Sequence, residues 1–202
     1  MTRRAMLITA ATGLPLLAQD PARDRAYALF EAKKWAEAEE AYAAIIATDP
    51  RNPQDHYYRG RAALEQDKWD VAKQSLMLAD KLGPKQDRIK VGLARVYLHE
   101  EKYDEAQTAL NDAAKINPEN PELPFYRGLL ALGRKQYVAA ADYLNKALQR
   151  NPDNDYAHLH LGIAYQHLKK PREMRRHLDQ FLKKQPNSPD AARVKEMLAA
   201  RR

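Results

Sequence analysis

The residues that could do chemistry in this chain are its six histidines and its many carboxylates, because the sequence contains no Cys. Without thiols it cannot form a disulfide, a thiolate metal site or a cysteine nucleophile. His158 and His160 are two residues apart and would point to different sides of a helix, and His160 and His167 are two turns apart, about 10 Å, too far to share one ion. We therefore expect surface or inter-repeat histidines, with no bound metal and no other cofactor.

Sequence motifs for catalysis are also missing. There is no glycine-rich phosphate loop, and neither GxSxG nor HExxH occurs. The carboxylates lie at ordinary spacing along what we expect to be solvated helix faces. The sequence therefore predicts that the protein is not an enzyme.

The composition favours helices and leaves two classes of partner to consider. Of the 202 residues, 45% are hydrophobic and 30% charged, and only seven are glycine. The net charge of +7 and the eleven tyrosines raise the alternative of a basic protein that binds single-stranded nucleic acid by stacking. Lysines and arginines alternate with acids, however, as in EAKKWAEAEE, which is typical of solvated helices with paired charges. A continuous positive groove would favour nucleic acid, and a mixed aromatic groove would favour a peptide.

Residues 1–18 read as an export signal rather than as part of the fold. Arg3 and Arg4 precede an apolar run from Ala5 to Ala18, which is too short to span a bilayer as a helix. The segment also resembles a twin-arginine export motif. We predict cleavage after Ala18 and location in the bacterial periplasm or outside the cell; a buried N-terminal helix is the alternative.

A period of 34 residues organises the rest of the chain. The period is marked by Pro50, Pro84, Pro118, Pro152 and Pro186. We number repeat positions so that each of these prolines is position 32, which gives repeats 19–52, 53–86, 87–120, 121–154 and 155–188. Position 8 is always Gly or Ala, and position 20 is Ala in the first four repeats. Apolar residues at helical spacing on either side predict two helices a repeat, with the small residues at their crossing and the proline ending the second helix.

These features resemble the tetratricopeptide repeat. The match includes the small residues at positions 8 and 20, the proline at 32 and an aromatic residue at position 17, namely Trp35, Trp69, Tyr103 and Tyr137. The resemblance covers residues 19–188 and implies an all-α tetratricopeptide-repeat α-solenoid, a right-handed superhelix of helical hairpins. Residues 189–202 are predicted to form a C-terminal capping helix, with Ser188 as its N-cap and Pro189 as its first residue.

Members of this family bind partner proteins along the concave side of the superhelix, so the resemblance implies a non-enzymatic scaffold for protein–protein interaction. Positions 2, 5, 9, 12 and 13 of each repeat lie opposite the packing stripe and should line this groove. The candidate groove residues are Tyr57, Arg61, Arg88, Arg95, Phe125 and Tyr156. Arginines that pair with carboxylates and aromatic rings that take apolar side chains predict an acidic partner segment with apolar anchors. No nucleic-acid partner is expected.

One specialised role within the family can be tested on the residues. Repeat domains that hold the C-terminal tails of heat-shock chaperones use a clamp of lysine, asparagine and further basic residues around the terminal carboxylate. At the corresponding positions of the first three repeats this chain has Arg23, Tyr27, Tyr58, Arg88 and Gly92. Only the two arginines are compatible, so this role is not predicted.

Overall fold

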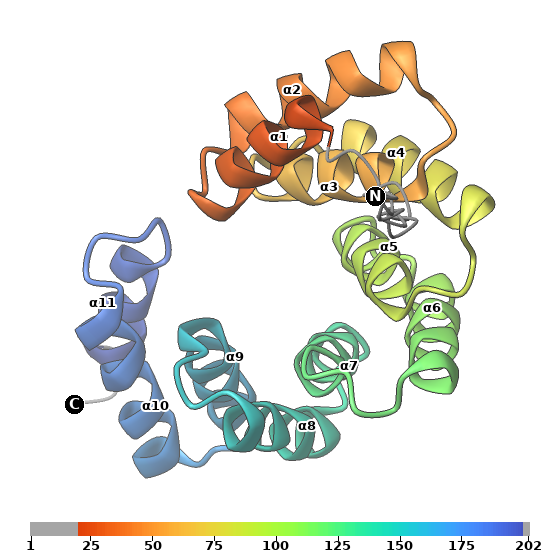
Figure 1. Ribbon diagram of the computed structural model, residues 1–202. Helices are drawn as coiled ribbons and strands as arrows, with labels where there is room; N and C mark the ends of the chain where they lie inside the picture. Colours follow the sequence, from red (N-terminus) through yellow and green to blue (C-terminus); the bar gives the residue numbers. More distant parts are fainter. Residues whose placement is uncertain (1–19, 200–202) are drawn as a thin grey trace, which may run out of the picture.

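The computed structural model describes residues 20–199, which form eleven α-helices without any strand (Figure 1). Helices α1 to α11 comprise Pro21–Glu31, Trp35–Thr48, Pro53–Leu64, Trp69–Leu82, Asp87–His99, Tyr103–Ile116, Leu123–Gly133, Tyr137–Arg150, Asp155–His167, Pro171–Lys184 and Ala191–Ala199. The predicted all-α solenoid is confirmed. Each helix of this described part is too short or too polar to cross a membrane.

The helices pair into five successive hairpins, one in each 34-residue interval, followed by the single helix α11. The stack of hairpins is strongly curved. Helices α5, α7 and α9 lie along the inside of the curve, and α6, α8 and α10 lie along the outside (Figure 1). Residues at the inner positions of consecutive repeats therefore face a common space.

Three of the five first helices, α1, α3 and α9, begin where a side chain satisfies a free N–H group, whereas α5 and α7 have no such side-chain cap. Asp20, Asn52 and Asn154 each accept a backbone N–H of the first turn at 2.9 to 3.0 Å. Pro21 and Pro53 then occupy the first helical position, where a missing N–H costs nothing.

The turn inside each hairpin repeats with the same backbone geometry. Position 15 has a positive φ of 55° to 59° in all five repeats, at Lys33, Asp67, Glu101, Lys135 and Lys169. The N–H of position 16 donates to the carbonyl of position 11 at 2.8 to 3.0 Å. This is a Schellman-type C-terminus, made here without glycine.

The second helix of each hairpin stops at position 30 because of the proline at position 32. A residue before proline is driven out of helical geometry, and position 31 has ψ between 56° and 94° in all five repeats. The five prolines therefore set the length of every second helix.

The core lies between helices and bridges neighbouring repeats. One cluster joins Leu76 of the second repeat to Ile89 and Val96 of the third, and the next joins Leu110 of the third to Leu130 of the fourth. All five side chains are at most 3% exposed. Because each cluster draws on two repeats, no hairpin buries its apolar surface alone.

The small residues at position 8 allow the helices of a hairpin to approach closely. A Cβ added to Gly162 would lie 2.3 Å from Cδ2 of Leu178, and one added to Gly128 would lie 2.6 Å from Cγ of Leu144. Both leucines are fully buried. Glycine at these crossings is therefore required by space rather than by backbone conformation.

The C-terminal helix α11 covers the last repeat, but it begins later than predicted. Ala191, Val194 and Leu198 are buried against the fifth repeat. The helix starts at Ala191 rather than Pro189, and Ser188 does not cap it. The Ser188 hydroxyl donates instead to the carbonyl of Gln185 at 3.2 Å, and the Val194 N–H bonds to the Asp190 carbonyl. Residues 188–190 thus form a turn between α10 and α11.

Candidate partner-binding groove

Two adjoining pockets open on the inner side of repeats 2 to 5, with volumes of about 600 Å³ and 270 Å³. Both are lined by Glu65, Arg95, Phe125, Tyr126 and Asn154. Most of the other lining residues also come from the first helices of consecutive hairpins, so the curvature of the stack creates the space. We call the two pockets together the concave groove.

Four of the six predicted groove residues line it, and the other two lie at its N-terminal end. Arg61, Arg95, Phe125 and Tyr156 line the pockets. Tyr57 is buried beside them: its hydroxyl accepts a hydrogen bond from Nη1 of Arg61 at 3.3 Å. The guanidinium of Arg88 lies 4.6 Å from the centre of the Tyr57 ring. Tyr57 therefore connects Arg88 to the groove.

Each of the three arginines has a partner within the chain. Arg61 pairs with Glu122 at 3.5 Å, which joins the second repeat to the fourth. Arg95 donates to Oε1 of Glu65 at 2.5 Å and to the Leu64 carbonyl at 3.0 Å. Arg88 donates to the side chain of Gln54. A ligand carboxylate at these sites would have to share or replace a partner that is already present.

The groove is mixed in charge rather than continuously positive. Glu65, Glu101 and Glu122 line it beside Arg61 and Arg95. Single-stranded nucleic acid would need a continuous positive groove. The mixed charge and the aromatic residues of this groove favour a peptide instead.

The larger pocket is apolar at its C-terminal end. Phe125 forms edge-to-face contact with Tyr126 at 5.3 Å between ring centres, and His160 lies 5.9 Å from Phe125. Burial lowers the pKa of His160 to about 4, so this imidazole is neutral near pH 7. Tyr156 is 43% exposed at the pocket rim, next to a wall that includes Leu129. A large apolar side chain is the ligand group that suits such a surface.

The aromatic residues at position 17 form a second set of groove-lining residues, which the predicted inner positions do not include. Trp69 and Tyr103 both reach the groove. The Trp69 ring stacks on His99 of the next repeat at 3.8 Å, and Tyr103 packs where a Cβ of Gly133 would lie 2.3 Å away. The period showed that position 17 is aromatic, but only the neighbouring repeat places its ring.

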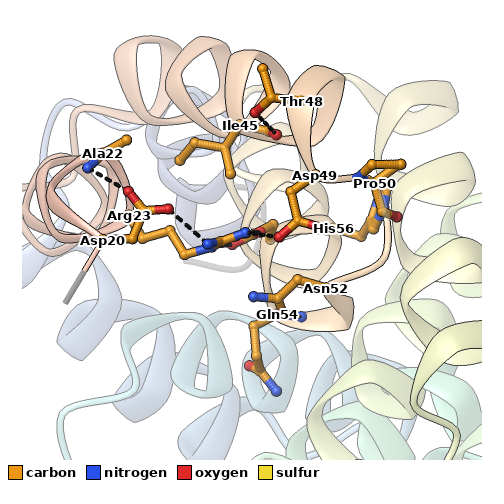
Figure 2. Close-up of polar contacts among 11 residues, drawn as sticks. Asp20, Ala22, Arg23, Ile45, Thr48, Asp49, Pro50, Asn52, Gln54 and His56 are labelled. Carbon is orange, nitrogen blue, oxygen red and sulfur yellow. Dashed lines mark hydrogen bonds and ion pairs between the residues drawn. The ribbon is translucent and has the colours of Figure 1, made fainter. Parts of the chain in front are cut away.

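The two basic residues compatible with a carboxylate clamp are both occupied. Arg23 pairs with Asp20 at 2.7 Å and with Asp49 at 2.6 Å (Figure 2). It also pairs with Asp55 at 2.8 Å. Asp55 is only 2% exposed. Arg23 is therefore a structural link between the first two repeats.

The histidines form a pair that the sequence spacing did not show. Nδ1 of His158 lies 2.9 Å from Nδ1 of His177 on the next helix, and His177 is 5% exposed. One imidazole must donate and the other accept. Across residues 20–199 no three His, Cys, Asp or Glu side chains are grouped to hold a metal ion.

Comparison with protein families agrees with this geometry. Tetratricopeptide-repeat models match residues 23–86 and 91–155, and a further one matches residues 131–198. The chain belongs to the tetratricopeptide-repeat family. None of the curated proteins compared with it matches the chain.

Several solved tetratricopeptide-repeat structures share the fold at low sequence identity. A thermophilic repeat protein of Thermus thermophilus, TTC0263, has a TM-score of 0.68 at 18% identity, covering 89% of this chain and 96% of that one. A chain of the APC/C hetero-tetramer Cut9–Hcn1 has a TM-score of 0.74 at 18% identity, and the match spans 86% of this chain but only 35% of that one. YrrB, described as a repeat protein with an unusual peptide-binding site, has a TM-score of 0.58 at 19% identity, with coverage of 87% and 91%.

Proposed function

We propose that this tetratricopeptide-repeat protein is a non-enzymatic scaffold that holds a segment of another protein in the concave groove. The observation that carries the proposal is the larger pocket of about 600 Å³, built by four consecutive repeats, in which apolar walls meet a few polar groups. The exposed Tyr156 ring offers a rigid anchor at its rim.

We propose further that the bound segment is acidic and carries apolar anchors. Its large apolar side chain would occupy the space between Phe125 and Tyr156. Its carboxylates would meet Arg61 and Arg88 at the other end, the first exchanging with Glu122 and the second with Gln54. Exchange of one carboxylate for another at Arg61 keeps the arginine paired, so it costs less free energy than leaving the guanidinium without an anion.

Site-specific photo-crosslinking tests this proposal. A benzophenone amino acid replaces Tyr156 in the groove or, as the control, Val138, which is 65% exposed on the outer helix α8. We expect a crosslinked protein from position 156 alone, with an acidic segment around the crosslinked residue. The same adduct from both positions, or from position 138 alone, would place the binding surface outside the groove. If the crosslinked segment were basic or neutral, the proposal of an acidic ligand would be refuted, but the proposal that the groove binds a segment would stand.

A further inference from the structure

The positive charge of this protein is concentrated at its C-terminal end. Residues 169–202 contain eleven Lys or Arg and four Asp or Glu, a net charge of +7, which equals the net charge of the entire chain. The preceding 168 residues are therefore neutral overall. This asymmetry is unrelated to the concave groove, whose charges are of both signs.

Three of these basic residues form a stripe on the outer face of α10. Arg172, Arg176 and Lys183 fall within about 40° of one another on the helix, and the stripe is about 16 Å long. All three are exposed, as is Lys169 in the turn just before α10. The buried face of α10 carries the apolar residues, so these four side chains, which we call the basic stripe, point away from the core.

The basic stripe has little internal compensation. Within residues 20–199 its four members make no ion pair; the one polar contact is between Nη2 of Arg176 and Nε2 of His177 at 3.2 Å. Asp179 is the one acid on the same face of the helix. Charges left unpaired on a surface are free to meet a charged partner.

The two arginines of the stripe are peculiar to the last repeat, whereas Lys183 matches Lys81 and Lys115, and Lys169 matches Lys33 and Lys135. The residues that match Arg172 and Arg176 in the other repeats are neutral or acidic: Ala36 and Glu40, Asp70 and Gln74, Asp104 and Thr108, Val138 and Asp142. The repeat architecture does not need basic residues at these positions, because four of five hairpins form without them.

We propose that the basic stripe docks the protein on the surface of an anionic phospholipid bilayer, on the side of the solenoid opposite the groove. Clusters of four or more Lys and Arg on an amphipathic helix gain about 1 kcal/mol for each residue near such a surface. The large hydrophobic residues exposed among residues 20–199 include two aromatics, Tyr27 and Tyr156, and neither is on α10, so the stacking that single strands need is missing.

Vesicle binding by the full chain tests the proposal. We expect binding to vesicles of phosphatidylcholine mixed with phosphatidylglycerol to exceed binding to phosphatidylcholine alone, and to disappear at high salt. The triple variant Arg172→Glu, Arg176→Glu, Lys183→Glu should lose about 100-fold in affinity. The matched control is Lys81→Glu, Lys115→Glu, Lys146→Glu, which makes the same charge change on exposed faces of α4, α6 and α8 and should lose far less.

Three results would overturn the proposal. Equal binding to both kinds of vesicle would show that anionic lipid is not recognised. Equal losses in the two triple variants would show an effect of net charge rather than of the stripe. Tighter binding to a single- or double-stranded oligonucleotide than to vesicles, lost only in the α10 variant, would assign the surface to nucleic acid. Circular dichroism of both variants shows that their helices are intact.

Discussion

Among individual residues, Arg23 makes the densest set of polar contacts in the first two repeats. Its guanidinium joins the start of α1 to Asp49 after α2 (Figure 2). It also pairs with the buried Asp55 in α3. The ion pair keeps the pKa of Asp49 below its usual range. Three segments distant in sequence are thus held by one cation.

We expect Arg23→Ala to reduce the free energy of unfolding by about 3 to 5 kcal/mol, because it leaves the Asp55 carboxylate buried without its cation. The double variant Arg23→Ala, Asp55→Ala should be more stable than the single one, since no charge then stays unpaired. Urea unfolding of the parent, of both single variants (Arg23→Ala and Asp55→Ala) and of the double variant completes the double-mutant cycle. Additive losses for the two substitutions would show that the two side chains do not interact.

The pair formed by His158 and His177 makes stability depend on pH. Burial, followed by the charges of Arg176 and His158, lowers the pKa of His177 to about 4, and burial lowers that of His158. Lys184 disfavours the His158 cation and Asp155 favours it. Two protonated rings could not share the Nδ1–Nδ1 hydrogen bond.

The direction of this pH dependence follows from the proton uptake of the unfolded chain. Between pH 6.5 and 4 the unfolded chain binds protons that the folded His177 does not, so stability falls as the pH falls through this range, by up to about 3 kcal/mol for this residue. The variant His177→Gln keeps a polar group without a titrating ring and should show a smaller loss. Urea unfolding at pH 7 and 4.5 measures the loss of stability in the parent and in His177→Gln. Equal losses in the two proteins would show that His177 is not the source of the pH dependence.

Among the elements, the turns inside the hairpins carry the same strain in every repeat. Position 15 is left-handed at five residues, all of which have side chains. A left-handed residue with a Cβ costs about 1 to 2 kcal/mol, whereas glycine loses about 0.5 to 1 kcal/mol of entropy on folding. The strain that glycine would relieve is larger than the entropy that it would lose, so glycine should be more stable than lysine at this position.

Lys135 offers a test of this strain, because it is exposed and makes no ion pair within residues 20–199. Lys135→Gly should raise the free energy of unfolding by about 0.5 to 1 kcal/mol. The control Lys135→Val should lower it, because a β-branched side chain fits this conformation worst. Urea midpoints rank the three proteins. A glycine variant less stable than the parent would show that the turn is not strained.

For the chain as a whole, we propose that the N-terminal segment directs where the concave groove and the basic stripe operate. Residues 1–18 lie outside the residues that the structure describes, and their sequence is the basis for proposing export to the bacterial periplasm. In that setting the stripe would meet the membrane from outside the cytoplasm.

We expect the protein from an envelope fraction to begin at Gln19. Exchanging both export arginines, Arg3→Lys with Arg4→Lys, should leave it uncleaved if the twin-arginine route is used. N-terminal sequencing of the fractionated protein gives the answer. A cytoplasmic protein that retains Met1 would contradict export.

The sequence by itself determined the repeat, the ends of the second helices and the family. Proline at 34-residue intervals ends a helix wherever it occurs, and small residues at position 8 allow a close crossing, so both act locally in every copy. These rules held from Pro50 to Pro186. The helical spacing within each repeat also placed Phe125 and Tyr156 on the inner face.

Only the tertiary structure decided how those positions combine. Arg61 meets Glu122 two repeats away, and His158 meets His177 across a hairpin. Such contacts depend on the angle between successive hairpins, which the period does not encode. Arg61 pairs with Glu122 and Arg95 with Glu65, because the curvature of the stack brings these carboxylates within reach, whereas Arg88 meets the amide of Gln54.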